Sequence, residues 1–535
     1  MEIESRRVDH LGIVAGMIRK VGMIKLIDDL LGVDDQNEVT PGEAVASMIM
    51  NGLGVSNRVL TLSPQFYETK ALDILLRPGI KPEHLNRYKL GRVLEKVADY
   101  GVEKFFTTVA LKSCVEEKVE LRTFSSDVTS YALSGAYDEE VDLEEVYVKH
   151  GYSKDHRPDL KQIVQELAVS HDGGVPVMVS VWPGNTSDVE VLRERTKKLL
   201  KLFADSDQTP CMIGDSKLYN EENIRQLNKI KFVTRVPSTI KRETQIVDQA
   251  IAEDDWQSID DKYGICEYNL NLYGVNQRWI VVKSQPAFQR AEKTLSKAVK
   301  KEFEGVQKKL FHLQAKRFGC ESDAIKAVNE IEKKLKFHKI SDFQVVKHAR
   351  SKKRGRPLPE DTYLEYQVNA VAKENEKKMQ HELEHRSCFV LATNLLPSEY
   401  SSKEILELYK KQDLVEKGFR FLKDPSFFAS SLYLKNQKRL QGLLVIMTLA
   451  ILIYSLAQRY IRQKLALLNL TIPNQIKQPT SRPTLRLIFQ IIEGINYIKV
   501  KMNGVEQVYI DGLTEIRRYI LKLFFIEVQQ IYQLA

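Results

Sequence analysis

The region from residue 118 to residue 236 constrains the fold most, because short apolar runs alternate there with helical patterns. It opens with KVELRTFSSDVTSYALSG, in which apolar and polar residues alternate as in a strand. We expect this strand to end near Asp127. The apolar runs QIVQELAVSH and VPVMVSVW then flank a DGG turn that tolerates the positive φ of a hairpin. A helix at 188–203, the strand TPCMIGD, a helix at 220–228 and the strand IKFVTRV complete a predicted α/β sheet layer.

Residues 1–117 are predicted to form a helical N-terminal domain. A helix start is expected at TPGE, where Thr40 would be the N-cap, Pro41 the first helical residue and Glu43 the reciprocal cap. Further helices are expected at 84–100 and 101–117. A compact basic unit of this kind binds DNA or serves only as a packing domain. The sequence shows no helix-turn-helix spacing that would decide between these alternatives.

The second half of the chain returns to the same α/β texture after a long interruption. Residues 237–386 read as an insertion domain with a β-hairpin and a long amphipathic helix whose apolar residues, Leu295 to Leu313, recur every three or four positions. Residues 118–236 and 387–464 would then be the two parts of one catalytic core. Residues 465–535 are predicted to be a helical C-terminal region.

Composition indicates a globular protein of the reducing cytoplasm. Lys and Arg number 80 against 71 Asp and Glu, a formal charge of +9 that permits a polyanionic partner. The five cysteines show no CxxC pairing, which argues against a disulfide framework or a zinc ribbon. The start, MEIESRR, lacks the apolar core of a secretory signal. Residues 443–457 are apolar but fall short of the roughly 20 residues of a membrane span, so we expect a buried helix and no membrane.

The segment 404–423, EILELYKKQDLVEKGFRFLK, is predicted to be one amphipathic helix. Its apolar residues form a stripe, while Tyr409, Gln412, Glu416 and Lys423 share a second face. Steps of seven residues from Tyr409 to Glu416 and from Glu416 to Lys423 are about two helical turns each. The alternative for a lone glutamate is an ordinary solvated charge.

Three carboxylates are expected to meet at the ends of elements in the α/β layer. Asp127 follows the first strand, Asp215 follows TPCMIGD, and Glu416 lies on the helix. Hard divalent cations prefer such oxygen ligands, and a metal pair activates an attacking oxygen and stabilises the leaving oxygen of a phosphodiester. Carboxylates held this close repel each other unless a cation lies between them.

These residues resemble a known family. The spacing of Tyr409, Glu416 and Lys423 is similar to the Y-R-E-K motif of bacterial insertion-sequence transposases with an RNase H-like DDE domain, in the IS-four-like superfamily and its IS-sixteen-thirty-four branch. The segments FSSDVTS, GYSKDHRPDLKQI, WPGNTSD and IGDSKLY occur in the expected order. Gln412 departs from the motif, which has arginine there. Lys410 or Lys411 replaces that basic contact only if the helix face allows it.

The resemblance implies roles for the residues it covers. Asp127, Asp215 and Glu416 would bind Mg²⁺, with Mn²⁺ as an alternative. Tyr409, Gln412 and Lys423 would lie against transposon-end DNA. A homodimer would hold two DNA ends, and the enzyme would act in the cytoplasm at the nucleoid. The family's β insertion fits residues 237–386, where Trp279 either stacks on a displaced base or belongs to the core.

Other segments give weaker signals. His156, Arg157 and Lys161 in GYSKDHRPDLKQI either contact phosphate or pack at a sheet edge. Arg354 and Arg356 in RGRP match the core of an AT-hook, whose alternative is a solvated basic loop. Asp188 in WPGNTSD is expected to cap the following helix. The sequence HELEH at 381–385 matches the H-E-x-x-H zinc signature, but its polar helix argues against a buried zinc protease site.

These patterns together predict a transposase that cleaves element ends and joins the 3′-hydroxyl to target DNA by metal-assisted phosphoryl transfer. The alternatives are a catalytically silent DNA-binding protein derived from a transposase, and a metal-dependent nuclease without strand transfer.

Overall fold

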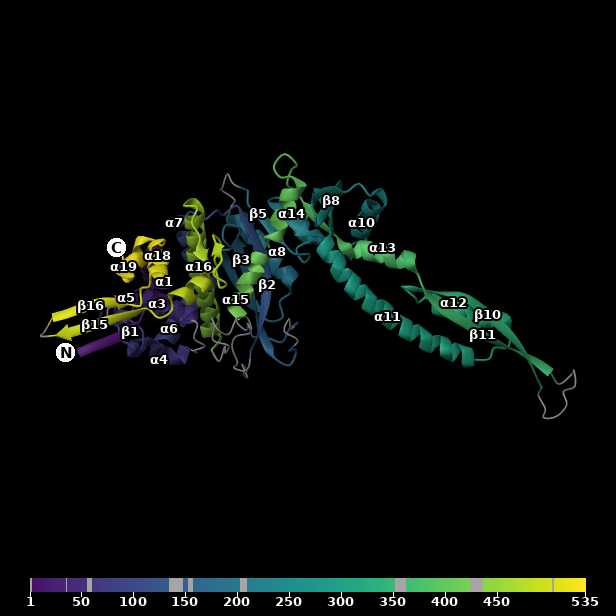
Figure 1. Cartoon of the computed structure of the whole chain (residues 1–535), viewed down its shortest axis with the longest axis horizontal. Coiled ribbons are helices and arrows are strands. Elements are labelled where there is room, and N and C mark those ends of the chain that lie inside the picture. Colours follow the sequence, from purple (N-terminus) through teal and green to yellow (C-terminus); the bar gives the residue numbers. More distant parts are fainter. Residues whose placement is uncertain are drawn as a thin grey trace. The chain divides into compact units, whose positions relative to one another are not determined.

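The computed structural model describes residues 2–34, 36–54, 60–133, 148–152, 157–202, 209–351, 362–423, 436–502 and 505–535. The chain divides into two compact units, which are Met1–Thr234 with Glu404–Ala535, and Arg235–Lys403. Figure 1 labels the elements of both.

The N-terminal part of the first unit is helical, as predicted, except for its first strand β1 (Glu2–Arg7). Thr40 Oγ1 accepts a hydrogen bond from Glu43 N at 3.1 Å, and Glu43 Oε2 accepts one from Thr40 N at 2.8 Å, which confirms the predicted cap. The helices expected at 84–100 and 101–117 are α6 and α7. The elements are α1 (Leu11–Lys20), α2 (Met23–Leu31), α3 (Pro41–Leu53), η1 (Leu60–Leu62), α4 (Ser63–Tyr67), α5 (Leu72–Leu75), η2 (Pro82–Leu85), α6 (Arg87–Tyr100) and α7 (Val102–Glu116).

A mixed sheet follows, with strand order β4-β3-β2-β5-β6 in this unit. Strands β2, β3 and β4 are antiparallel neighbours, whereas β2–β5 and β5–β6 are parallel. Gly173 and Gly174 adopt φ values of 90° and 68° in the predicted hairpin turn between β3 and β4. The elements are β2 (Thr123–Leu133), β3 (Lys161–Ser170), β4 (Pro176–Pro183), α8 (Asp188–Leu202), β5 (Cys211–Gly214), α9 (Glu221–Leu227) and β6 (Lys231–Arg235).

The long apolar helix α16 (Gln437–Leu467) belongs to the core of this unit. By length and composition it could cross a membrane, but 89% of its most apolar 18-residue window is buried inside the protein. It packs on α3, α6, α7 and β4. Its Thr448 hydroxyl accepts a hydrogen bond from Gln165 Nε2 at 2.9 Å, and Arg459 Nη2 lies 2.6 Å from Asp172 Oδ2 in the hairpin turn. The helix therefore fixes the β3–β4 hairpin.

The C-terminal region differs from the predicted helical region. Strands β1, β15 and β16 form an antiparallel sheet, in which Glu2 pairs with Lys501. The alternating pattern of NYIKVKM suits a strand, but its partner lies at the opposite end of the sequence. The elements after the insertion are α14 (Ser402–Lys410), α15 (Asp413–Lys423), β13 (Ile472–Pro473), β14 (Pro479–Thr480), α17 (Leu485–Ile492), β15 (Asn496–Met502), β16 (Val505–Asp511), α18 (Glu515–Lys522) and α19 (Ile526–Ile531).

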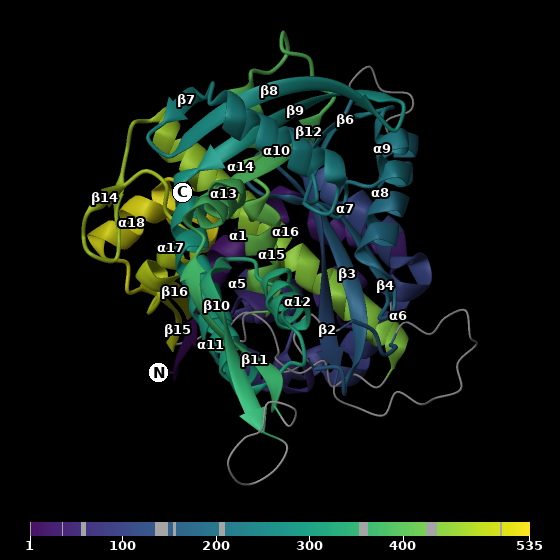
Figure 2. The ribbon, with the colours of Figure 1, turned by 90° about the vertical axis from the view of Figure 1, so that its right-hand side faces the viewer.

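The second unit combines strands in the order β12-β9-β8-β7 with the separate hairpin β10–β11, which α12 packs against. Figure 2 shows α12 beside this hairpin. The predicted amphipathic helix α11 buries Leu295, Val299 and Leu310, whereas Phe303 is 40% exposed. The elements are α10 (Lys241–Glu253), β7 (Gln257–Asp260), β8 (Tyr263–Leu272), β9 (Val275–Ser284), α11 (Gln285–Ala315), α12 (Glu321–Glu332), β10 (His338–Ser351), β11 (Thr362–Glu374), α13 (Glu376–Ser387) and β12 (Cys388–Thr393).

Candidate active site

Of the two predicted catalytic aspartates, Asp127 lies on strand β2 and Asp215 directly follows its parallel neighbour β5. Strand β2 pairs with β5 so that Ser125 is opposite Ile213. Asp127 and Asp215 each come two residues later, just beyond the last paired residues, and therefore lie at the same level along the two strands. Strand β5 ends at Gly214, but β2 continues, so the expectation that the first strand ends near Asp127 was wrong. Asp127 lies within a strand at the level where its neighbour stops.

Lys217 joins these aspartates in a charged cluster. Its backbone N–H donates to Asp215 Oδ1 at 2.9 Å, and its ammonium forms an ion pair with Asp188. Burial lowers the pKa of Lys217, but the Asp188 hydrogen bond and the charges of Asp188, Asp215 and Asp127 outweigh it and raise the pKa. The carboxylate of Asp188 thus pairs with Lys217. The side chain of Ser187 provides the cap of α8, because its Oγ accepts from Glu190 N at 3.2 Å.

Helix α15 lies along the strand that carries Asp127. A Cβ atom on Gly418 would be 3.1 Å from Leu167, and Leu167 pairs with Asp127 across β3 and β2. Further along, Lys423 Nζ is 5.5 Å from the ring centroid of Tyr131, four residues after Asp127. The helix therefore runs in the same direction as β2 and crosses the level of Asp127 near Gly418.

Glu416 is on this helix, but its carboxylate faces solvent. The side chain is 70% exposed and accepts a hydrogen bond from Arg420 Nη2 at 2.9 Å, one helical turn later. Within the described ranges, no group of three His, Cys, Asp or Glu side chains is arranged to hold a metal ion. The structure therefore brings Asp127 and Asp215 together and places Glu416 on the neighbouring helix without closing the triad.

The predicted single helix at 404–423 is wrong, because the chain breaks into α14 and α15. At the break the Gln412 N–H donates to Tyr409 O at 3.0 Å, a three-residue turn in place of the helical four-residue step. Gln412 thus lies in the turn, and Tyr409 is on a different helix from Glu416. The alignment of Tyr409 with Glu416 on one straight face does not hold. Glu416 and Lys423 still share α15.

A half-buried histidine, His171, lies beside the break and was not found from the sequence. His171 Nε2 is 2.7 Å from Ser125 Oγ, on the same strand as Asp127. Burial, reinforced by the charge of Lys411, lowers the pKa of His171 to about 4, while Asp413 opposes this shift. The imidazole is therefore neutral at pH 7. Its only sequence signal is the position just before the DGG turn.

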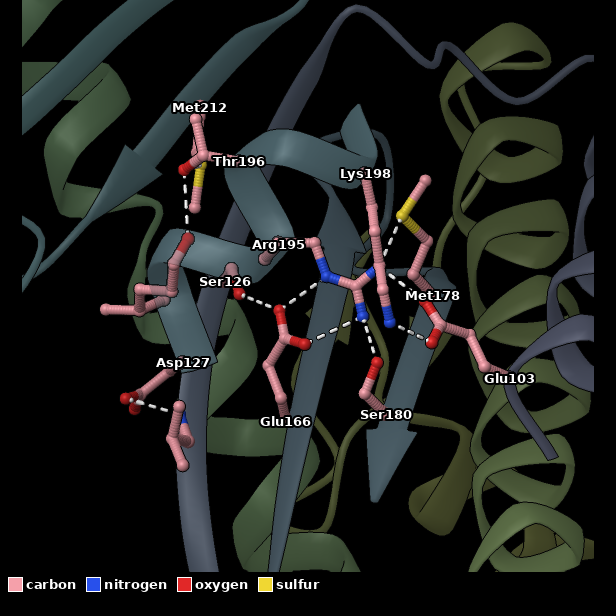
Figure 3. Close-up of polar contacts among 12 residues, drawn as sticks. Glu103, Ser126, Asp127, Glu166, Met178, Ser180, Arg195, Thr196, Lys198 and Met212 are labelled. Carbon is pink, nitrogen blue, oxygen red and sulfur yellow. Dashed lines mark hydrogen bonds and ion pairs between the residues drawn. The ribbon is translucent and has the colours of Figure 1, made fainter. Parts of the chain in front are cut away.

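A buried ion pair lies on the face of the sheet opposite to Asp127 (Figure 3). Arg195 donates to both oxygens of Glu166 at 2.7 Å, and the two side chains are 1% and 0% exposed. Glu166 also accepts from Ser126, the neighbour of Asp127, at 2.7 Å. Arg195 further contacts Ser180 at 2.7 Å and Glu103 of α7 at 3.3 Å. The charged residue within the apolar run QIVQELAVS was the signal that the sequence interpretation missed.

Of the three residues predicted from GYSKDHRPDLKQI, the structure places Lys161 away from the aspartates. His156 lies outside the described residues. Arg157 is exposed and makes a two-pronged ion pair with Asp159 at 2.9 and 2.7 Å. Lys161 pairs with Leu133, six residues along β2 from Asp127. That separation is about 20 Å along the strand.

Trp279 is fully buried, and its indole N–H donates to Gln277 Oε1 at 3.0 Å. This corrects the expectation that it stacks on a displaced base, because strand β9 faces the core there. The core alternative describes this tryptophan. Arg354 and Arg356, with the AT-hook pattern, lie outside the described residues.

The two histidines of HELEH lie near one aspartate of α10. His381 Nε2 and His385 Nε2 are 3.2 and 3.9 Å from Asp248 Oδ1. The three side chains are not arranged as a metal site. The predicted polar character of this helix is confirmed, since Ser387 is its one residue that is buried.

Comparison with models of known protein families shows to which family the chain belongs. The family described as "Transposase DDE domain" matches residues 136–453, more than half of the chain. The chain belongs to this transposase family. The match includes Asp215 and Glu416 and begins after Asp127. Residues 3–111 match a family described as "Domain of unknown function (DUF4277)".

A search of curated proteins finds no match. A solved structure described as "piggyBac transposase synaptic complex with hairpin DNA" is similar with a TM-score of 0.38 and 7% identity, covering 92% of this chain and 82% of that chain.

The residues at the aspartate pair suit the divalent metal ion on which DDE transposases generally depend. Asp127, Asp188 and Asp215 offer only oxygen atoms, the donors that Mg²⁺ and Mn²⁺ prefer. The Lys217 ammonium forms an ion pair with Asp188 and is stabilised by the charges of Asp215 and Asp127, so these carboxylates already attract one cation. The chemistry of this donor set therefore fits a hard cation.

Proposed function

We propose that this DDE transposase uses Asp127, Asp215 and Glu416 to hold Mg²⁺ or Mn²⁺, cleaves the ends of its DNA element and joins the 3′-hydroxyl to target DNA. The observation that carries the proposal is the parallel register of β2 and β5, which brings Asp127 and Asp215 to one level. Residues 118–236 and 387–464 would form the RNase H-like core, with 237–386 as its insertion.

Different residues of the chain would have different roles in phosphoryl transfer. When bound, a metal pair would activate the attacking oxygen and stabilise the leaving oxygen. The aspartates fix the position of the scissile phosphate relative to β2 and β5. Lys423 on α15 offers an ammonium to a neighbouring phosphate, and Tyr409 a phenol hydroxyl. Glu416 turns from Arg420 to the aspartates as the site closes, because catalytic geometry often tightens only with substrate.

The branch and the partners follow from the motif. Tyr409, Glu416 and Lys423 keep the Y-R-E-K spacing of the IS-sixteen-thirty-four branch, and Gln412 in the α14–α15 turn replaces its arginine. Double-stranded element ends and target DNA would be the substrates, held by a homodimer in the cytoplasm at the nucleoid. The N-terminal domain at 1–117 would support end binding.

The test is cleavage and strand transfer on linear DNA that carries the ends of the encoding element, with Mg²⁺ or Mn²⁺. Asp127→Asn, Asp215→Asn and Glu416→Gln should each abolish both steps while DNA binding is retained. Asp413→Asn is the matched control, because Asp413 makes a similar exposed ion pair on α15, with Lys417 at 2.6 Å. It should keep most of the activity.

Each outcome separates the alternatives. Cleavage at full rate in Glu416→Gln would remove Glu416 from the triad. DNA binding without cleavage in the unaltered protein would indicate a silent DNA-binding derivative. Cleavage without joined product, measured on the same gel, would indicate a nuclease.

A further inference from the structure

The aspartate site contains its own cation. Lys217 lies two residues after Asp215 and donates its backbone N–H to that carboxylate at 2.9 Å. Its side chain reaches in the direction of α8 and forms an ion pair with Asp188. The Asp188 side chain is 15% exposed and that of Lys217 is 45% exposed, so the ammonium is held at the border of the site.

Without Glu416, the formal charges of this cluster match one divalent cation, the first of the proposed pair. Asp127, Asp188 and Asp215 contribute −3 and Lys217 contributes +1, which leaves −2. Glu416 does not add to this sum while it pairs with Arg420. Without the ammonium, the formal charge of the cluster would be −3, which raises both the mutual repulsion of its carboxylates and their attraction for cations.

Resting on the proposed function, we propose that Lys217 is the built-in counter-ion of the aspartate pair. Its charge partly neutralises the aspartates before metal binds and opposes the entry of a second cation, and the ion pair with Asp188 keeps the ammonium at the site. Lys217 therefore sets the metal concentration at which the site fills. This is a positioning and electrostatic role, and no atom of Lys217 enters the phosphoryl transfer.

The competition can be measured without DNA and without catalysis. Isothermal titration calorimetry of the full chain with Mn²⁺ should show tighter binding in Lys217→Met, by about tenfold, the factor that corresponds to 1.4 kcal/mol. The metal-free melting temperature of the same variant should fall, and Mn²⁺ should restore it. Lys217→Arg, which keeps the charge, should bind Mn²⁺ within about twofold of the unaltered protein, a difference well below the tenfold step.

Lys197→Met is the matched control. Lys197 forms an exposed ion pair with Glu194 at 2.7 Å on α8, the helix that begins at Asp188. It should leave the Mn²⁺ affinity unchanged. Unchanged or weaker Mn²⁺ binding in Lys217→Met would overturn the proposal, including the case in which only DNA binding is lost, which would make Lys217 a phosphate ligand.

Asp127→Asn separates this inference from the proposed function. If Asp127→Asn binds Mn²⁺ as tightly as the unaltered protein, the aspartate pair is not the metal site and the proposed function itself fails. If Asp127→Asn loses Mn²⁺ binding while Lys217→Met binds as before, the metal site stands and only the counter-ion role is refuted.

Discussion

The buried pair of Glu166 and Arg195 should be a main determinant of the stability of the catalytic sheet. Glu166→Gln keeps the shape of the side chain but removes its charge, which leaves the guanidinium of Arg195 buried. Removing one partner of a buried ion pair typically costs about 3–5 kcal/mol. Glu103 contacts the same guanidinium at 3.3 Å and is 31% exposed, so it compensates in part. We therefore expect a loss near the lower end, about 3 kcal/mol.

This loss in the free energy of unfolding is measured by urea denaturation, from the midpoint and the slope of the unfolding transition. Glu221→Gln is the control, because Glu221 pairs with Arg225 on the exposed surface of α9, with side chains 57% and 63% exposed. Such a pair contributes less than about 1 kcal/mol. The double variant Glu166→Met with Arg195→Met removes both charges and should recover most of the stability, because no buried charge is left unpaired.

The reasoning predicts a further effect on the neighbouring site. Ser126 donates to Glu166 and precedes Asp127, so Glu166→Gln should also loosen β2, seen as faster amide hydrogen exchange across 123–133. Equal stability losses in Glu166→Gln and Glu221→Gln, with unchanged exchange in β2, would refute the claim that this network holds the strand.

Three further perturbations give measurable outcomes. The pKa of His171 is lowered to about 4, so the unfolded chain takes up the proton first and stability falls as pH drops from 6.5 toward 4. His171→Asn should reduce this loss by at most about 2 kcal/mol between pH 7 and 5, in urea unfolding at both pH values. Gly442→Ala should destabilise the protein strongly, because its Cβ would lie 2.4 Å from Leu94 O. Gly305→Ala is the control, because its Cβ meets nothing within 4 Å; it should raise the free energy of unfolding by up to about 1 kcal/mol, and the melting temperature with it. Thr40→Ala removes the confirmed cap of α3 and should cost about 1 kcal/mol in the same urea assay.

Local chemistry explains what could be predicted from the sequence. The cap at Thr40, the DGG turn and the end of the strand before Asp215 each depend on residues within four positions of one another. A turn or a cap requires particular backbone conformations and hydrogen bonds, and only certain residue types provide them. These features therefore appear in the sequence before any tertiary contact is known.

The features that were missed depend on distant partners. Strand β1 pairs with β15 at the other end of the chain, and Glu166 on β3 needs Arg195 from helix α8, which follows the next strand, β4. The break at Gln412 is also a tertiary effect, since α15 must lie along β2 with Gly418 against Leu167. The apolar periodicity predicted one continuous helix over 404–423, because this spacing contains no information about the strand on which the helix packs.

The exposed pair of Glu416 and Arg420 does not oppose a catalytic role for Glu416. An i,i+4 pair with side chains 70% and 73% exposed contributes only about 0.3–0.5 kcal/mol. A change of side-chain rotamer breaks it and would free the carboxylate for the metal of the proposed function. The proposed role depends on the position of α15, which Gly418 allows to pack closely on Leu167, the partner of Asp127. A bulkier residue at Gly418 would push the helix from β2 and move Glu416 with it. Gly418→Val should therefore lower strand transfer more than it lowers stability, and an equal effect on both would assign Gly418 to packing alone.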